Sequence, residues 1–558
     1  MTDRPTSTGT SRRAFLAAAL ATATAAMVDP RSLAAARARA AALPTGELFP
    51  LGVASGDPTA TGVVLWTRLV APTGGDALPS DDVAVDWVVR DVATDALIAS
   101  GTAPAVAALG HSVHVEVDGL DPDTWYRYSF SVDGRSSPVG RTRTFPGAGV
   151  APAQVRFAIA SCQNYSSGFY VAHEFLAAED VDFVAFLGDY IYEKPSSGGV
   201  RPTPLPLAQD LATYRARYEL YKADPHLQAA HHRFPWIVTM DDHEVANNVL
   251  GDYGPDGEAA GDPGAIAAYR ARRADAFQAW FEHQPVRLPP PSGPDYVLHR
   301  VVEHSDLLRI YVLDGRQYRS LYPGGATAGP TNDEVFDESR TMLGAAQEAW
   351  LDDAFAATDA RWNVIANQTV MSSTPFSTGS VAVYNFDQWD GYVAARQRLL
   401  RSLVANRVRN PLVVTGDIHV GGASSVRLDY EDPDAPDIAY EVIGTSISSS
   451  ADAALVGLLE GSVSKLPWVR YVNGRQRGYA VVTLTAEGAT ADFRVVSTAL
   501  EDTPAVSVAT DFTDVIPDRE PIELPVEPPT STTTTTTTPS TDGPPAATPV
   551  PGSASYTG

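Results

Sequence analysis

The sequence predicts an α/β domain that follows a smaller all-β domain. From Val155 onward, short apolar runs alternate with helical patterns, which is typical of α/β folds. Residues 46–146 contain only short strand patterns, separated by Gly, Pro and Asp. A chain of 558 residues also favours more than one hydrophobic core. We therefore predict a β domain over residues 46–146 and an α/β domain over residues 151–510.

The N-terminus has the pattern of an export signal. Residues 11–16 read Ser-Arg-Arg-Ala-Phe-Leu and precede a weakly apolar, Ala-rich stretch that runs to Val28. Residues 34–42 then offer several Ala-x-Ala cleavage sites. Paired arginines before a short apolar region are typical of a twin-arginine signal. We predict that residues 1–42 are a signal peptide read by the twin-arginine translocase, and that the mature protein is secreted or associated with the cell wall.

The β domain has the pattern of a small sandwich. Strands are expected over residues 62–68, 83–90 and 111–117. Residues 120–128 read Leu-Asp-Pro-Asp-Thr-Trp-Tyr-Arg-Tyr and resemble the tyrosine corner of fibronectin-III and immunoglobulin-like sandwiches. We therefore expect a fibronectin-III-like or Ig-like sandwich in this region.

In the α/β region, a potential metal ligand follows each of six apolar strand patterns. Helical patterns, such as those over residues 169–179 and 211–222, lie between these strands. In layered α/β proteins, sites form where strands end at one edge of a sheet. Asp and Asn also favour turns and helix caps, so one such residue alone indicates little. The pairs are Phe157–Ala160 with Cys162, Phe183–Leu187 with Asp189, Trp236–Met240 with Asp242, Leu307–Leu313 with Asp314, Val364–Ala366 with Asn367, and Leu412–Val414 with Asp417.

Cys162 is the only cysteine, so no internal disulfide can form. An inert buried thiol, a nucleophile and a metal ligand remain open as interpretations. The neighbours favour a metal. Asp189 follows a glycine, and Tyr192 is three residues further on, so both side chains point the same way if the turn is helical. A thiolate, a phenolate and a carboxylate together suit ferric iron better than magnesium.

A second group of hard ligands follows from two other segments. Residues 241–244 read Asp-Asp-His-Glu, where Asp242 could bind a second metal while His243 faces the substrate. The alternative is a salt-bridged helix cap. Asp417 and His419 share one face if their segment is extended. Oxygen-rich ligation of this kind suits calcium.

The C-terminal end and the overall charge limit other roles. From about Pro525 the chain is rich in Pro and Thr, with seven consecutive threonines after Ser531, which predicts a disordered tail over residues 525–558. The net charge of −26 argues against specific nucleic-acid binding. After the signal, no apolar run approaches the length of a transmembrane segment.

The combined motifs resemble the alkaline phosphatase D (PhoD-like) family, over about residues 46–500. The segments that carry the resemblance are residues 52–58 (Gly-Val-Ala-Ser-Gly-Asp-Pro), 64–68 (Val-Leu-Trp-Thr-Arg), 160–163 (Ala-Ser-Cys-Gln), 187–193 (Leu-Gly-Asp-Tyr-Ile-Tyr-Glu), 241–248 (Asp-Asp-His-Glu-Val-Ala-Asn-Asn), 313–319 (Leu-Asp-Gly-Arg-Gln-Tyr-Arg) and 416–419 (Gly-Asp-Ile-His). The resemblance implies a four-layer metallophosphoesterase sandwich flanked by helices, with Fe³⁺ and Ca²⁺ as cofactors.

Carried onto this sequence, the resemblance implies particular roles. The iron would be held by Cys162, Asp189 and Tyr192, with His419 nearby. Asp189 would bridge to a second metal, whose other ligands would be Asp242, Asn367 and Asp417, with Gln368 as the alternative to Asn367. His243 and Asp189 would be the catalytic residues. Weak candidates for phosphate binding are Arg272, Arg273 and Arg316.

The expected function is therefore metal-dependent hydrolysis of phosphate mono- and diesters outside the cytoplasm, for phosphate scavenging. The substrates would be small phosphate esters, or diesters of the phospholipid or teichoic type. One alternative is a phospholipase D-like phosphodiesterase on the same scaffold. The other is a non-catalytic secreted metal-binding protein, which would have no need of Cys162 and Tyr192 beside a carboxylate.

Overall fold

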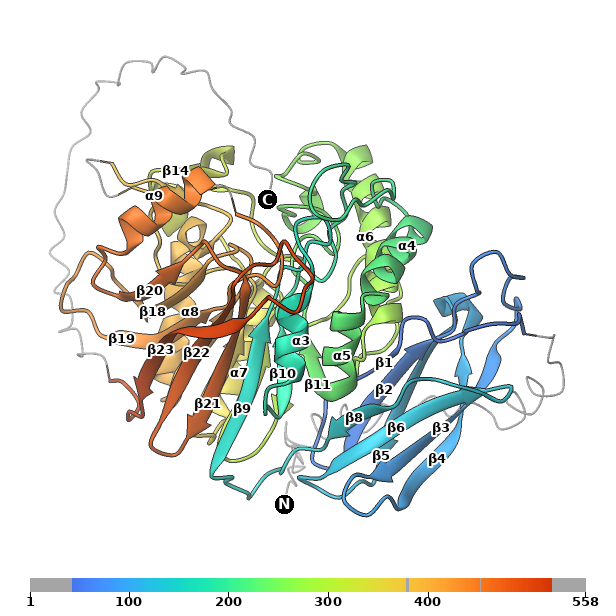
Figure 1. Ribbon diagram of the computed structural model, residues 1–558. Helices are drawn as coiled ribbons and strands as arrows, with labels where there is room; N and C mark the ends of the chain where they lie inside the picture. The colour runs from blue at the N-terminus through green and yellow to red at the C-terminus, as the bar shows by residue number, and fades with distance from the viewer. Residues whose placement is uncertain (1–42, 378–380, 452, 524–558) are drawn as a thin grey trace, which may run out of the picture.

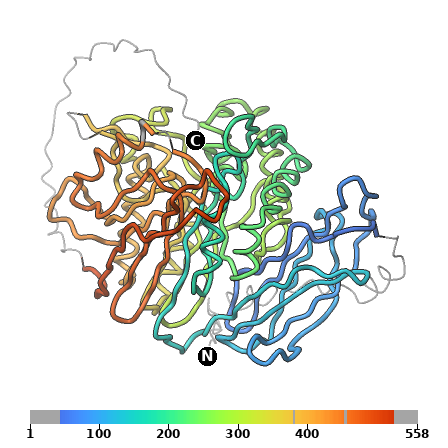
Figure 2. The backbone as a smooth tube through the Cα atoms, viewed as in Figure 1, coloured from blue at the N-terminus to red at the C-terminus, as the bar shows by residue number. Residues whose placement is uncertain are grey.

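The computed structural model describes residues 43–377, 381–451 and 453–523 (Figures 1 and 2). The predicted signal peptide over residues 1–42 and the predicted tail over residues 525–558 lie outside these ranges. Two large β-sheets dominate the described part. Among its helices, none combines the length and apolar character that a membrane span requires.

The first sheet has nine strands in the order β23-β22-β21-β9-β10-β11-β1-β2-β5. Its middle strands, β9, β10, β11 and β1, run parallel to one another. The strands are β1 (Val53–Gly56), β2 (Gly62–Arg68), β5 (Ser112–Asp118), β9 (Gln154–Ala160), β10 (Phe183–Phe186), β11 (Pro235–Val238), β21 (Gly478–Thr485), β22 (Gly488–Val496) and β23 (Val508–Pro517).

The second sheet has seven strands in the order β12-β13-β15-β17-β19-β18-β20. Strands β13, β15, β17 and β19 form its parallel middle. A separate pair, β14 (Ala328–Gly329) and β16 (Tyr384–Asn385), is antiparallel. The strands of the second sheet are β12 (Arg300–Glu303), β13 (Leu308–Val312), β15 (Trp362–Ala366), β17 (Pro411–Thr415), β18 (Gly421–Arg427), β19 (Asp437–Ile443) and β20 (Val469–Asn473).

Helices cover the outer faces of the two sheets (Figure 1). The first sheet is covered by α3 (Val171–Ala177), α4 (Leu211–Lys222), α5 (Pro225–Arg233) and α6 (Pro263–His283). The second is covered by α7 (Ala345–Ala356) and α8 (Val393–Ala405). The expected helices over residues 169–179 and 211–222 are present as α3 and α4.

Successive side chains along a strand point to opposite faces of the sheet, and this alternation explains the layers. In β10, Val184 and Phe186 pack beneath the helices, whereas Phe183 and Ala185 pack against the second sheet. The rings of Phe157 and Phe183 stack at 5.0 Å in this central layer. The expected four-layer α/β architecture is therefore confirmed.

The N-terminal strands form two facing sheets around a core of their own. One face consists of β1, β2 and β5. The other has the order β4-β3-β6-β7, and β8 pairs with β6. The strands of this second face are β3 (Val83–Asp91), β4 (Leu97–Ala105), β6 (Trp125–Val132), β7 (Arg135–Ser136) and β8 (Gly140–Arg143). The Tyr126 hydroxyl accepts a hydrogen bond from the Asp121 amide at 2.9 Å, as expected for a tyrosine corner.

The N-terminal region is continuous with the α/β region. Strand β1 pairs in parallel with β11, where Ser55 lies opposite Pro235 and Gly56 opposite Trp236. The indole of Trp66 on β2 also donates to the Glu282 carbonyl of α6 at 3.0 Å. Because strands from both predicted domains share one sheet, the division between residues 146 and 151 stays a prediction.

Candidate metal centre and active site

The six expected strands are present, and their carboxyl ends bring the predicted ligands to one edge of the two sheets. The strands are β9, β10 and β11 in the first sheet, and β13, β15 and β17 in the second. Four of the residues beyond these ends have left-handed backbones, with φ of 56° at Cys162, 55° at Asp189, 66° at Asp417 and 58° at His419. Non-glycine residues rarely adopt this conformation, and such strain concentrates at functional sites.

The loops after β10 and β11 approach each other closely. Gly188 has φ of 109°, and a Cβ atom there would lie 2.4 Å from the Asp241 Cβ. The carboxylate of Glu244 then ties the loops together by accepting the backbone N–H groups of Asp189 at 3.1 Å, Tyr190 at 2.6 Å and Asp241 at 2.9 Å. The segment Asp-Asp-His-Glu therefore supplies candidate metal ligands and, in Glu244, the residue that fixes their loop.

A first group of donors surrounds Cys162. Ligand atoms of Cys162, Asp189 and His419 lie within 4.8 Å of one another, and all three residues are buried. The Tyr192 hydroxyl donates to Asp189 Oδ2 at 2.8 Å and lies 2.9 Å from His419 Nε2. Burial and the nearby Asp189 carboxylate raise the pKa of both the Cys162 thiol and the Tyr192 hydroxyl. A cation at this point would replace their protons.

A second group lies on the other side of Asp189. Atoms of Asp189, Asp242 and His243 are within 4.8 Å of one another, as are atoms of Asp241, Asp242 and Asp417. Asp189 belongs to the Cys162 group and to this one, which is the position a bridging carboxylate would occupy. Burial and the carboxylates of Asp242 and Asp241 raise the pKa of Asp189.

The donor set fits metal cations. Asp241 Oδ2 and Asp242 Oδ1 are buried, and neither has a hydrogen-bond partner in the described residues. Unpaired buried carboxylate oxygens are costly unless a cation or a donor satisfies them. The thiol, the phenol and the His419 imidazole gather on one side of Asp189, and the carboxylates lie on the other side together with the His243 imidazole. The first set suits a softer or trivalent ion, and the second suits a hard divalent ion.

Arg316 is placed differently from the expected phosphate contact. Its guanidinium is buried and donates to Asp241, to Asp387 at 2.9 Å and to Asp417 at 2.8 Å. These carboxylates raise its pKa although burial opposes the charge. Burial, opposed by Arg316, raises the pKa of Asp417 to about 6. Arg316 therefore compensates the charge of the carboxylate cluster from behind, and it does not line the pocket that opens onto this cluster.

The other two arginine candidates lie on α6, away from the pocket. Arg272 donates to the Tyr214 hydroxyl at 2.8 Å and to the Val245 carbonyl at 2.9 Å. Arg273 donates to the Gly251 carbonyl at 2.8 Å and to Asp252 at 2.7 Å. Neither side chain lines the pocket, so the expectation that they contact phosphate has no support in this geometry.

His243 has a partner that the sequence did not reveal. Its Nδ1 lies 2.6 Å from Glu193 Oε2, and both side chains are buried. Burial lowers the pKa of His243, but the carboxylates of Glu193 and Asp242 together outweigh burial, and the net pKa is raised. Glu193 lies in the segment that carries Asp189 and Tyr192, and this position is the only sequence signal that could have indicated a role at the site. Ser449 was also missed; its Oγ lies 2.7 Å from the Tyr192 hydroxyl.

The geometry favours Asn367 over Gln368 as a ligand. Gln368 donates to the Leu313 carbonyl at 2.7 Å and to Thr239 at 2.9 Å, and its Oε1 accepts the Gly315 amide at 2.9 Å. The side-chain nitrogen and oxygen of Gln368 are therefore both engaged in hydrogen bonds. Within the described part of the chain, the Asn367 Oδ1 accepts only a long hydrogen bond, of 3.4 Å, from the Trp389 indole.

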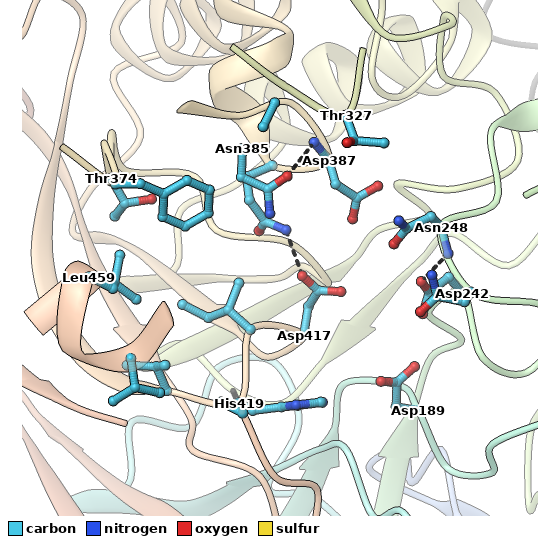
Figure 3. A pocket seen from close by; sticks show the side chains of 18 of the residues that line it. Asp189, Asp242, Asn248, Thr327, Thr374, Asn385, Asp387, Asp417, His419 and Leu459 are labelled. Carbon is cyan, nitrogen blue, oxygen red and sulfur yellow. Dashed lines mark hydrogen bonds between the residues drawn. The ribbon is translucent and has the colours of Figure 1, made fainter. Parts of the chain in front are cut away.

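A pocket of about 180 Å³ opens onto this cluster (Figure 3). Its polar side contains Asp189, Asp242, His243, Asp417 and His419. The Gln388 side chain donates to Asp417 Oδ2 at 2.6 Å, and the backbone N–H of Asn248 donates to Asp242 Oδ2 at 2.5 Å. Helix α9 (Ala453–Val463) forms part of the opposite wall. The arrangement can hold cations on one side of a phosphate group and offers a histidine beside it.

Known proteins resemble this chain over most of its length. The chain matches the PhoD-like phosphatase family over residues 157–493 and the N-terminal domain of PhoD-like phosphatases over residues 34–146. It is 39% identical to alkaline phosphatase D of Bacillus subtilis (strain 168) over 474 residues, which cover 83% of this chain and 80% of that protein. A solved structure of PhoD matches with a TM-score of 0.79 at 37% identity, covering 87% of this chain and 94% of the other. The chain belongs to the PhoD-like phosphatase family and is a phosphoric ester hydrolase.

Proposed function

We propose that this phosphatase hydrolyses phosphate mono- and diesters outside the cytoplasm, with ferric iron and calcium as its cofactors. Cys162, Asp189, Tyr192 and His419 would hold the iron. The shared position of Asp189 between two donor groups is the observation that carries this proposal. The calcium ligands would be Asp189, Asp242, Asn367 and Asp417.

In this proposal, the cations, His243 and Arg316 have different roles. When bound, the cations supply positive charge against the phosphoryl oxygens and acidify water. His243 keeps its Nδ1 on Glu193, which leaves Nε2 as the nitrogen that donates a proton to the phosphate or the leaving group. Arg316 holds Asp241 and Asp417 in place from behind.

Export and substrate range complete the proposal. The paired arginines Arg12 and Arg13 would direct the folded, metal-loaded protein to the twin-arginine translocase, and the protein would work in the medium or the cell wall. Small phosphate esters are the substrates we expect first. Teichoic-type diesters and phospholipid headgroups are tested beside them, and a rate on phosphatidylcholine above that on small esters would favour the phospholipase D-like alternative.

Metal content and colour test the iron assignment. A thiolate and a phenolate on ferric iron give charge-transfer absorption in the visible range, so we expect coloured protein that contains iron and hydrolyses p-nitrophenyl phosphate and its bis-ester. Active, colourless protein without iron would refute the assignment.

Selective chelation tests calcium. Removal of calcium by a chelator that spares iron should abolish turnover on both esters, and added calcium should restore it. Full activity after chelation would remove calcium from the proposal while leaving the iron site intact.

A further inference from the structure

The wall of the pocket opposite the carboxylates is apolar. It is formed by Phe376, Ile418, Val420, Val456 and Leu459. Figure 3 shows Leu459 across the pocket from Asp189 and Asp242, with Asp417 and His419 between them. The apolar wall is therefore within reach of an ester group whose phosphate lies at the carboxylate cluster.

Three short segments build the apolar wall: the loop at Phe376, residues 418–420 and helix α9. Val456 and Leu459 are three residues apart on α9 and thus lie on one face of this helix. Val420 and Leu459 are buried and belong to a small cluster that also includes Val463, separate from the cores between the layers. The Ser462 hydroxyl donates to the Phe376 carbonyl at 2.8 Å, which ties the Phe376 loop to the same helix. The wall is therefore a packed surface.

The charge of the pocket points to the same class of substrate. None of the described residues that line the pocket is Lys or Arg. Arg316 is saturated by Asp241, Asp387 and Asp417. Arg477 donates to the His419 carbonyl at 2.7 Å and does not line the pocket. Asp387 also lines the pocket. A second anionic group that extends beyond the proposed cations toward the apolar wall would therefore meet carboxylates or apolar side chains, and it would lose its hydration without gaining a counter-charge.

We propose that the wall formed by Phe376, Ile418, Val420, Val456 and Leu459 is a subsite for an uncharged apolar ester group, so that aryl and alkyl phosphate esters are preferred over hydroxylated or polyanionic ones. This inference rests on the proposed function, because it places the phosphate at the carboxylate cluster. Apolar area removed from water supplies the preference. A contact of this kind is worth about 10-fold or more in kcat/KM.

The test compares benzyl phosphate with 2-hydroxyethyl phosphate and phosphoglycolate, three esters of alcohols, on the metal-loaded enzyme. We expect benzyl phosphate to exceed the other two by about 10-fold or more in kcat/KM. Leu459→Asn should remove most of that preference by lowering kcat/KM on benzyl phosphate about 10-fold, with a change of less than about 2-fold on 2-hydroxyethyl phosphate. Val456→Thr, which keeps the shape of the side chain, should act in the same direction.

Leu458→Asn is the matched control. Leu458 is the neighbouring residue on α9, is 60% exposed and does not line the pocket. The same substitution there should leave all three rates and their ratios unchanged. Equal losses on benzyl and 2-hydroxyethyl phosphate in Leu459→Asn and Val456→Thr, or no initial preference for benzyl phosphate, would overturn the subsite while leaving the hydrolase intact.

Binding of phosphonates separates this inference from the proposed function. Benzylphosphonate and 2-hydroxyethylphosphonate cannot be hydrolysed, so their dissociation constants report the subsite without turnover. If benzylphosphonate binds more tightly and Val456→Thr weakens that binding, the subsite is supported even when neither ester is turned over. A lack of turnover would count against the proposed function alone. Equal affinities for the two phosphonates would overturn the subsite.

Discussion

Replacement of Arg316 by Met tests whether this arginine organises the carboxylate cluster or contacts the substrate. The guanidinium is buried and bonded to Asp241, Asp387 and Asp417, so Arg316→Met removes the shared cation from three carboxylates at once. Met fills most of the vacated volume, which limits any cavity. The loss therefore reports the charge interactions.

The magnitude follows from the burial of the cluster. Removal of one partner from a buried ion pair costs about 3–5 kcal/mol, because the remaining charge stays desolvated. We expect a loss of this size in the free energy of unfolding, measured by urea denaturation of the metal-loaded protein. Metal content should fall as well, because Asp241 and Asp417 lose their common anchor. Arg316→Lys retains the charge without the planar fork, so it should recover only part of the loss.

A contact with substrate gives a different signature. In that case Arg316→Met would leave the unfolding free energy within about 1 kcal/mol of the parent and raise KM on a small monoester at unchanged metal content. That result would refute the organising role and return Arg316 to the group of phosphate-binding residues.

Four further predictions concern the site and export. Asp189→Asn should lower metal content and abolish turnover, whereas His243→Asn should keep both metals and lose about 10²–10⁴-fold in kcat; metal loss in His243→Asn would make His243 a ligand. Glu193→Gln should move the alkaline limb of the kcat/KM profile to lower pH, because Glu193 raises the His243 pKa; an unchanged profile contradicts this. Glu193→Gln should lose most stability between about pH 4.5 and 6.5. The raised pKa of His243 stabilises the fold fully below about pH 6.5, and this stabilisation is lost as pH rises through the folded-state pKa. The lowered pKa of Glu193 stabilises the fold fully above about pH 4.5, and this stabilisation is lost as pH falls through the folded-state pKa. Arg12→Lys with Arg13→Lys should trap precursor in the cytoplasm; normal secretion of the double variant would indicate another route.

The strand ends and the gathering of most candidate ligands at one edge could be predicted from the sequence because their signals are local. An apolar run followed by a polar residue, as at Cys162, Asp189 and Asp417, marks the end of a buried strand wherever the strand lies in the sheet. Parallel strands then bring those ends to one edge without any further information.

The remaining features depend on pairing between distant segments. The sequence could not show that Arg316 faces carboxylates, because a buried arginine and a substrate-binding arginine look alike in a motif. Glu193 pairs with His243 across two loops, and nothing in either loop alone indicates the contact. The pairing of β1 with β11 could not be predicted for the same reason, because the two strands lie far apart in the sequence.

The shared sheet has a consequence for synthesis of the protein on the ribosome. Strand β9 pairs with β10 on one side and with the late strand β21 on the other, while β11 pairs with β1 from the start of the chain. The parallel trio β9-β10-β11 is therefore enclosed by strands from opposite ends of the described chain. A nascent chain cannot close this sheet until residues 478–485 have left the ribosome. Termination before that point leaves β9 with an open edge, which is a template for aggregation.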